Sequence, residues 1–437
     1  MIFIKRKELG RKLIFFELIY VLSIGMVSDL LEIHWISYGI DVVNMAVLVL
    51  FLTYRKFLTE VFRMRLQYVL YAVLLLCAAA WLTALLNTVP ILLVLWSTRN
   101  ALRFFPFFFA VILFWNEKAT EVFSKILIWL QIPNTIIALI EFYLLDLRGD
   151  YLGGLFGFTK GCNVFLAAYF FIVVTLVVEK YLHGKLNFVV MGATCFASLI
   201  ISAMAELKVS YVVIPLIIIA SFVLNKPSLK TFVLAAVISV GMVVAVNLIV
   251  FFFPLWTDSF SSIKALISVG TKIGGGYNIP RFGAFSEINE IFFHNSIIRN
   301  LIGYGFGACE YSSYDFLTSD FYGRYGALNY RWFSHQMWFL QTGYLGIVCY
   351  AGFILTVFFW ITKMKRRFGD AGGIGSYGQI MCGVMIVSFV YNSSLTMESG
   401  YFLFAALAIP FVYYKDFIFS RRKKEKQNTA IVSALQP

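Results

Sequence analysis

Apolar residues dominate the chain in long runs that short polar segments interrupt. A helix that crosses the hydrocarbon core of a bilayer needs about 20 consecutive apolar residues. Twelve runs near that length can be read along the chain, at about 13–31, 36–54, 66–89, 98–115, 122–145, 164–181, 186–204, 209–224, 231–253, 336–361, 376–391 and 398–414. The pattern predicts an all-α polytopic membrane protein with about twelve transmembrane helices, forming a single integral membrane domain over residues 1–437.

Composition supports this prediction and excludes a soluble globular protein. Of the 437 residues, 60% are hydrophobic and 14% are charged. The surface of a soluble domain must carry polar groups, so this excess of apolar residues has to face lipid. The N-terminal segment is basic and precedes an apolar run that contains Glu17 and Asp29, without a small-residue cleavage site. We interpret it as an uncleaved first helix.

The six cysteines are scattered and form no CxxC pair. Neither a disulfide framework nor a zinc site is indicated, and no metal or other cofactor is expected.

Positive charge collects in alternate connections between the predicted spans. The segments on one side hold 25 of the 36 Lys and Arg residues. They are the N-terminal segment, "YRKFLTEVFRMR", "NEKATEVFSK", "EKYLHGK", "NKPSLK", "KMKRRFGD" and the tail 415–437. The positive-inside bias predicts cytoplasmic termini. The basic tail is better explained as a topology determinant touching anionic lipid than as a nucleic-acid site.

One large polar interruption, 254–335, separates spans nine and ten and is predicted to lie outside the cytoplasm. Within "AFSEINEIFFHNSIIRNLIGYGFG", the apolar residues Phe285, Ile288, Phe292, Ile298 and Leu301 recur roughly at helical spacing. This spacing predicts an amphipathic helix near the outer membrane surface, so the loop is expected to contain short helices.

The other eleven Lys and Arg residues lie in the connections predicted to be outside the cytoplasm or within the spans themselves. They are Arg99, Arg103, Arg148, Lys160, Lys208, Lys264, Lys272, Arg281, Arg299, Arg324 and Arg331. A cation near the middle of a span costs roughly 2.5–3.5 kcal/mol on insertion scales. Arg99 and Arg103 share a helix face, and Lys208 follows Glu206. Snorkelling or local pairing explains each cation alone. As a group, the cations favour a lipid phosphate or pyrophosphate ligand.

Aromatic residues crowd the same region. Tyr304, Trp332 and Trp338 are candidates for stacking against sugar rings, although an interfacial aromatic belt explains single residues equally simply. "GYGFG" at 303–307 lacks the Lys-Ser/Thr of a nucleotide-binding loop and is interpreted as a tight turn.

Four stretches, in this order, resemble motifs of the O-antigen polymerase/ligase superfamily of bacterial polysaccharide assembly. They are "GGLFGFTKGCNVFLAAYF" (153–170), "SAMAELKVSYVVIPL" (202–216), "RFGAFSEINEIFFHNSIIRNLIGYGFG" (281–307) and "SHQMWFLQTGYLGIVCYAGF" (334–353). The resemblance covers about residues 150 to 360. Lys208 stands where the family has an arginine, and the spacing from His335 to Gly343 is about one helical turn shorter than in the family.

The resemblance implies a glycosyltransferase-C-like (GT-C-like) membrane fold. It also implies metal-independent glycosyl transfer on the outer face of the bacterial cytoplasmic membrane. The donor and the acceptor would be oligosaccharide repeat units linked to polyprenyl pyrophosphate. The product would be a surface polysaccharide such as O-antigen, capsule or exopolysaccharide. A chain-length regulator and a flippase are the partners that the family implies, besides membrane lipid.

The resemblance also implies roles for individual residues. His335 would orient or deprotonate the acceptor hydroxyl. Arg281 and Lys208 would hold the pyrophosphate, and Arg299 and Arg103 are further candidates for binding it because they belong to the group of outer cations. Glu206, Gly305 and Gly307 would give structural support. His294 is a rival to His335, and an interfacial ring bonded to a loop carbonyl is the structural alternative for His335.

Two other functions stay open. A ligase would transfer a finished chain to a different acceptor, and the sequence only weakly favours a polymerase. A flippase or exporter of lipid-linked saccharide would need cations along a path through the whole membrane, whereas the cations here cluster on the outer side. A purely structural scaffold would leave the outer cations unexplained.

Overall fold

The computed structural model describes residues 2–225, 240, 247 and 278–434, and every regular element in these residues is a helix. The α-helices before the gap are α1 (Ile2–Leu31), α2 (Gly39–Leu52), α3 (Phe57–Arg63), α4 (Gln67–Leu86), α5 (Ile91–Ser97), α6 (Phe104–Phe114), α7 (Glu117–Tyr143), α8 (Asn163–Leu182), α9 (Phe188–Met204) and α10 (Ser210–Leu224). Those after it are α13 (Ala284–Ile288), α14 (Ile297–Ile302), α15 (Asp320–Tyr325), α16 (Ser334–Phe368), α17 (Ile374–Tyr391) and α18 (Ser399–Ala434).

Seven of the described helices are long and apolar enough to cross a membrane. An eighth span is formed if α2 and α3, which meet at a bend of 76°, count as one broken helix. The predicted spans 98–115, 186–204 and 209–224 correspond to shorter apolar helices, and 231–253 lies outside the described residues. The structure thus confirms a polytopic helical membrane protein, while the count of twelve spans stays a prediction.

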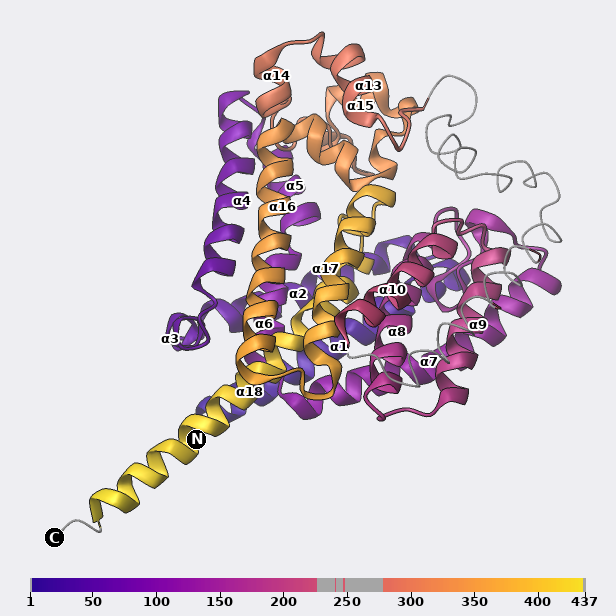
Figure 1. The fold of residues 1–437 in the computed structure, drawn as a ribbon. Helices are drawn as coiled ribbons and strands as arrows, with labels where there is room; N and C mark the ends of the chain where they lie inside the picture. The colour runs from indigo at the N-terminus through magenta and orange to yellow at the C-terminus, as the bar shows by residue number, and fades with distance from the viewer. Residues whose placement is uncertain (1, 226–239, 241–246, 248–277, 435–437) are drawn as a thin grey trace.

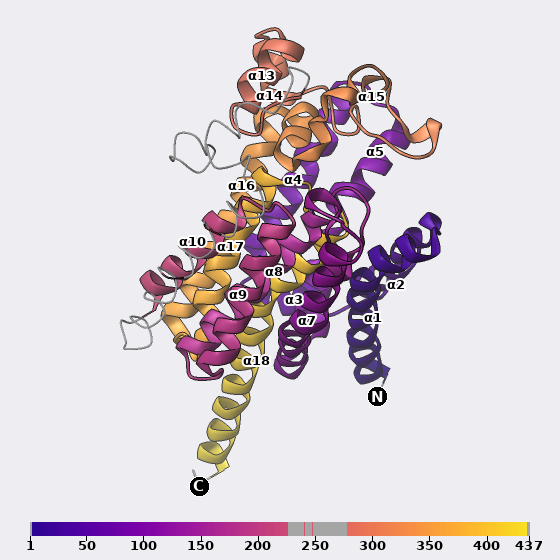
Figure 2. The same cartoon turned by 90° about the vertical axis from the view of Figure 1, so that its right-hand side faces the viewer.

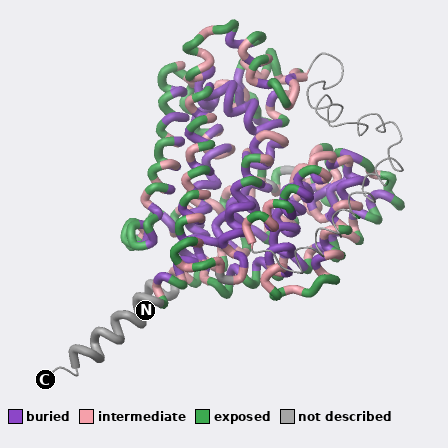
Figure 3. The backbone as a smooth tube through the Cα atoms, viewed as in Figure 1, coloured by how far each residue is buried: buried purple, intermediate pink, exposed green. Residues whose placement is uncertain are grey.

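The helices form a bundle with buried and lipid-facing members (Figures 1 and 2). α8 packs against α7, α9, α10, α17 and α18, and nearly all of its residues are buried. α4 lies beside α16 at the edge of the bundle. Its outer surface exposes Leu74, Leu75 and Leu82, which lipid would cover. Figure 3 shows the same contrast between a buried interior and an exposed periphery.

Polar side chains at the helix ends form hydrogen bonds with backbone groups that have no partner within the helix. The side chain of Asn116 accepts a hydrogen bond from the Ala119 amide at the start of α7, and Asn187 does the same for Val190 in α9. At the end of α6, the buried Lys415 ammonium donates to the carbonyls of Ile112, Leu113 and Trp115. Such partners are required because hydrocarbon offers no substitute for water.

The predicted amphipathic helix after residue 283 is broken into two pieces. α13 continues into a π-helical turn, Asn289–Phe293, and Ile288 and Phe292 are buried as expected. His294 and Asn295 then adopt left-handed conformations with φ of 50° and 59°, which end the helix. In α14, Ile298 and Leu301 are exposed. A single helical face over the whole segment was therefore a wrong expectation, because Asn tolerates the left-handed region that stops a helix.

Helix α16 also contains a break, and the segment 278–333, named the outer loop after its predicted side of the membrane, docks into it. Gly343 has φ 58° and ψ −156°, which interrupts the helix nine residues after it begins. The carbonyls of Leu340 and Gln341 accept hydrogen bonds from the amides of Tyr304 and Gly305 at 2.9 and 2.8 Å. The break thus fixes the outer loop on the membrane bundle.

Helix direction separates the two ends of the bundle. α8, α16 and α18 begin where α9 and α17 end, and each of the three runs toward a basic segment at its far end. The outer loop with α13, α14 and α15 stands at the first end, and both termini lie toward the other (Figure 1).

Candidate functional site

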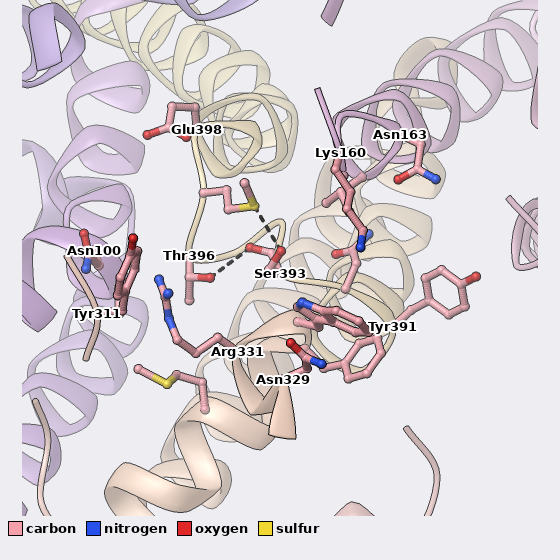
Figure 4. Close-up of a pocket in the computed structure, with 18 of the residues that line it drawn as sticks. Asn100, Lys160, Asn163, Tyr311, Asn329, Arg331, Tyr391, Ser393, Thr396 and Glu398 are labelled. Atoms are coloured by element: carbon pink, nitrogen blue, oxygen red, sulfur yellow. Dashed lines mark hydrogen bonds between the residues drawn. The ribbon is translucent and has the colours of Figure 1, made fainter. Parts of the chain in front are cut away.

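A cavity of about 1010 Å³ opens at the end of the bundle where α8, α16 and α18 begin. Its wall combines side chains from segments that lie far apart in the chain (Figure 4). The charged residues that line it are Arg99, Lys160, Lys208, Arg281, Arg331, Asp150, Glu206, Glu310 and Glu398.

The loop before α8 reaches the cavity because polar side chains of α1 and α7 hold its backbone. Asp29 of α1 accepts hydrogen bonds from the amides of Phe158 and Thr159 at 2.7 and 3.0 Å. From α7, Glu141 accepts from the Gly154 amide at 2.7 Å and Asn134 accepts from the Leu155 amide at 3.1 Å. Such compensation is what irregular backbone needs at membrane depth. The loop carries Lys160 into the wall of the cavity.

Asn163 joins this loop to the connection between α9 and α10. Its amide donates to Asp150 Oδ1 at 2.9 Å and to the Ala205 carbonyl at 3.2 Å. Glu206, with φ 53°, and Lys208 follow in the cavity wall. Burial raises the pKa of the Glu206 carboxyl. Burial, followed by the nearby Arg281 cation, lowers the pKa of the Lys208 ammonium to about 8, although Glu206 acts in the opposite direction.

Arg281 lies between two aromatic rings in the same wall. Its guanidinium carbon is 4.5 Å from the ring centre of Phe333 and 4.0 Å from that of Tyr391. Stacking fixes the plane of the guanidinium and leaves its edges for a planar anionic partner. Its buried Nε has no hydrogen-bond partner among the described residues.

His335 lies behind Arg281 and is not part of the cavity wall. Only 4% of its surface is exposed, and its Nε2 is 3.1 Å from the Arg281 carbonyl oxygen. A carbonyl only accepts, so Nε2 must donate. The structure therefore brings together Lys208, Arg281 and His335, but with the imidazole holding the backbone of Arg281 instead of facing the cavity.

Two further cations of the cavity wall lie against aromatic rings. The Arg331 guanidinium lies 4.8 Å from the ring centre of Tyr311, and Figure 4 shows it extending toward Thr396. The Lys160 ammonium lies 6.0 Å from the ring centre of Trp332. Neither cation forms an ion pair with a carboxylate of the described segments, and the same holds for Arg281.

Arg103 and Arg99 belong to a cluster of ion pairs beside the cavity. Arg103, with 4% of its side chain exposed, pairs with Asp41 and with Glu398, each at 3.1 Å. Arg99 pairs with Asp41 at 2.5 Å and lines the cavity, whereas Arg103 does not. Arg103 therefore ties α2 to the connection between α17 and α18, and the structure does not place it where it would contact a ligand in the cavity.

Glu310 lies on the side of the cavity that also carries two cations, since Arg99 donates to Asn100 Oδ1 at 2.8 Å and Arg331 lies over the Tyr311 ring. Glu310, which is 3% exposed, accepts hydrogen bonds from Ser97 at 2.7 Å, Gln341 at 3.0 Å and Asn100 at 3.0 Å. In Figure 4, Asn100 and Tyr311 lie on one side of the cavity, and Lys160, Asn163 and Tyr391 on the other. Glu310 belongs to the Asn100 side through its hydrogen bond.

The remaining predicted residues fall into two groups. Trp332 and Trp338 line the cavity, the first 44% exposed and the second buried. Arg299 and Tyr304 lie elsewhere. Arg299 donates to Asn87 Oδ1 at 2.6 Å, and the Tyr304 hydroxyl donates to the Phe292 carbonyl. The structure thus gives both residues contacts that hold the outer loop.

Gly305 and Gly307 join the outer loop to the membrane helices. Both have positive φ, 100° and 98°, and a Cβ at either position would meet atoms of Thr83–Val94 at 3.0 Å or less. Only glycine fits such a position without strain.

Sequence reasoning missed Glu310 and the connection 392–398, which supplies Asn392, Ser393, Thr396 and Glu398 to the cavity wall. The signal was present, since "NSSLTME" is a polar interruption between two apolar runs at the same end of the bundle as the large loop. Lys160 and Arg331 were noticed as outer cations but were not assigned to the site.

No protein-family model and no curated protein matches this chain. Within the described residues, no group of three His, Cys, Asp or Glu side chains is arranged to hold a metal ion.

Proposed function

We propose that the protein is a membrane glycosyltransferase that polymerises oligosaccharide repeat units carried on polyprenyl pyrophosphate. The observation that carries the proposal is the convergence of Lys208 and Arg281, with Lys160 and Arg331, on one cavity at the end of a membrane bundle. Lys208, Arg281 and Arg331 are half-buried and Lys160 is exposed, and an anion in the cavity would compensate this cluster of positive charge. A pyrophosphate between sugar and lipid supplies that compensation at this depth.

The chemistry that suits this wall is stabilisation of a leaving pyrophosphate. When the bond between the anomeric carbon and the pyrophosphate oxygen breaks, negative charge grows on the phosphate oxygens. The stacked guanidinium of Arg281 offers two donors in a fixed plane, and Lys208 adds a point charge. Preorganised cations in a site shielded from water stabilise such charge most effectively.

The proposed location is the outer face of the bacterial cytoplasmic membrane. The cavity and the basic segments lie at opposite ends of α8, α16 and α18. The positive-inside bias then assigns the basic end to the cytoplasm and the cavity to the other side. There the saccharide would be extended while the polyprenyl tail stays in the bilayer.

The test uses purified full-length protein in lipid nanodiscs with a lipid-linked oligosaccharide repeat unit and no added metal. We expect a ladder of polymer lengths from the wild type. Arg281→Ala should remove the ladder while the protein stays folded. Arg148→Ala, which removes an exposed arginine outside the cavity, is the matched control and should retain it. Failure of the wild type with every repeat unit supplied would contradict the proposal.

The same assay separates the two alternative functions. A ligase would leave lipid-linked repeat units unextended and would transfer them only to an added acceptor of another kind. A flippase would make no new glycosidic bond and would move labelled lipid-linked saccharide across the bilayer of a proteoliposome. Ladder formation from repeat units alone would favour the polymerase over both.

A further inference from the structure

We infer that the carboxylate of Glu310 accepts the proton of the attacking hydroxyl group in the proposed glycosyl transfer, and that His335 is a positioning residue for Arg281. The inference rests on the proposed function and names the proton acceptor for that reaction. It follows from the distribution of charged groups around the cavity.

The imidazole of His335 does not occupy the position of a proton acceptor. Its Nε2 already donates to the Arg281 carbonyl, and the residue does not contribute to the cavity wall. A general base must come within hydrogen-bond reach of the hydroxyl, directly or through one water. The proton acceptor should therefore be sought among the groups that line the cavity.

Four carboxylates line the cavity, and their partners distinguish them. Glu398 forms an ion pair with Arg103 at 3.1 Å, which stabilises its proton-free form and weakens it as a base. Glu206 and Asp150 lie on the side of Lys208, where a carboxylate would oppose pyrophosphate binding. Glu310 lies on the other side and forms no ion pair with any described cation; its hydrogen bonds come from Ser97, Asn100 and Gln341, which are neutral.

The geometry of a single displacement favours the Glu310 side. The nucleophile approaches the anomeric carbon from the face opposite the leaving group. With the pyrophosphate on the side of Lys160 and of Tyr391, against which Arg281 stacks, the acceptor hydroxyl enters from the side of Asn100 and Tyr311. Glu310 is bonded to Asn100 on that side.

The proposed step balances without a further reactant. The hydroxyl oxygen of the acceptor sugar forms a bond to the anomeric carbon of the donor. The bond from that carbon to the pyrophosphate oxygen breaks, and its electron pair leaves with the lipid pyrophosphate. The hydroxyl proton passes to a Glu310 carboxylate oxygen and is released to water after the product departs.

Glu310→Gln tests the inference in the nanodisc assay with the lipid-linked repeat unit. Gln keeps the size of the side chain but cannot take up the proton, so we expect the rate of elongation at saturating substrate to fall by 10²–10⁴-fold. The KM for the repeat unit should change less than threefold. Asp315→Asn is the matched control, because it removes a carboxylate from an exposed position of the same loop outside the cavity. It should retain the wild-type rate.

A second variant separates catalysis from folding. Glu310→Ala opens space beside the cavity, and we expect added formate to restore part of its rate in proportion to formate concentration. Formate should not stimulate Asp315→Asn or Arg281→Ala. If Glu310→Gln elongates at the wild-type rate, or if Glu310→Ala is folded but formate leaves it inactive, the inference is overturned. Both outcomes require an active wild type, so they are distinct from failure of the proposed function.

Discussion

The Nε2 atom of His335 lies 3.1 Å from the backbone carbonyl oxygen of Arg281, across 54 positions of the sequence. The same Arg281 is stacked between Phe333, two residues before the histidine, and Tyr391 at the end of α17. One residue is thus held at its carbonyl by an imidazole and at its guanidinium by two rings. Its orientation toward the cavity is set by α16 and α17 together.

His335 variants are predicted to act through substrate binding. His335→Ala removes the hydrogen bond to Arg281 and should raise the KM for the lipid-linked repeat unit about tenfold, equivalent to roughly 1.4 kcal/mol for one buried hydrogen bond. His335→Gln retains an N–H donor of similar reach and should stay within about threefold of the wild type. Steady-state elongation kinetics of both variants would measure this difference.

The rate at saturating substrate distinguishes this role from proton transfer. A positioning residue leaves that rate within a few-fold in His335→Gln. If His335 were the proton acceptor, Gln and Ala would both lower the rate by 10²–10⁴-fold, which is the size of effect expected for loss of a general base.

Lys208 predicts a pH dependence of pyrophosphate binding. Its pKa is lowered to about 8 from the ordinary 10.5, chiefly by burial. The charged form that binds an anion is lost as the pH rises through 8, so the dissociation constant for a lipid pyrophosphate should increase between pH 7 and 9. Lys208→Arg should flatten this dependence, because a guanidinium stays charged throughout. Titration of a lipid-pyrophosphate analogue by calorimetry would measure it.

Stability should change with pH in the opposite direction. Between pH 8 and 10.5 the unfolded chain binds more protons at Lys208 than the folded chain does, so this residue makes folding more favourable as the pH rises.

The binding prediction for Lys208 has a matched control. Lys125→Arg, at an exposed position of α7 outside the cavity, should keep the wild-type pH profile of pyrophosphate binding. A profile unchanged in Lys208→Arg would remove Lys208 from the binding site.

Arg103 variants are predicted to lose thermal stability, because Arg103 holds a cluster of ion pairs and does not line the cavity. Removing this arginine leaves Asp41 and Glu398 without a shared partner in a largely buried cluster. Breaking a buried pair in this way costs about 3–5 kcal/mol. Arg103→Ala should therefore lower the melting temperature of the purified protein markedly. Lys12→Ala breaks an exposed pair with Glu8 and should shift it by little, since exposed pairs contribute at most about 1 kcal/mol. Equal shifts in the two variants would contradict this account.

Gly343 is predicted to control the attachment of the outer loop. Its φ of 58° is strained for any residue with a Cβ, and a Cβ there would come within 2.6 Å of the Leu301 carbonyl. Gly343→Ala should loosen the hydrogen bonds from Tyr304 and Gly305 and expose the loop to protease. Gly352→Ala, at an uncrowded helical position of α16, should leave protease sensitivity unchanged and stabilise the helix by about 0.5–1 kcal/mol. Equal cleavage in the two variants would argue against this role.

Much of the fold was readable because apolar runs have a fixed minimum length in a bilayer. The runs at 66–89, 164–181 and 376–391 correspond closely to α4, α8 and α17. The breaks were not readable. The interruption at Gly343 occurs inside apolar sequence, where hydropathy does not report a change in backbone direction, and the polar residues 53–56 between α2 and α3 gave no indication of a 76° bend. Their hydrogen bonds come from residues far away in the chain, which no local pattern reveals.

The candidate site was also partly predictable from the sequence. Lys208 and Arg281 are cations in apolar surroundings, and such residues stand out in any membrane protein. Arg103 stood out equally, yet Asp41 and Glu398 neutralise it. Whether a cation serves a ligand or an internal carboxylate depends on tertiary contacts. Glu310 escaped notice because an acidic residue in a long polar loop is unremarkable until its neighbours are known.

The connection between α17 and α18 has a consequence for biogenesis. Asn392, Thr396 and Glu398 line the cavity wall, and the connection that carries them comes later in the chain than the other segments that line it. A nascent protein that has already inserted Lys208, Arg281 and His335 still has an open hollow without its last side. A chain released before residue 392 would therefore occupy the membrane with an incomplete cavity wall.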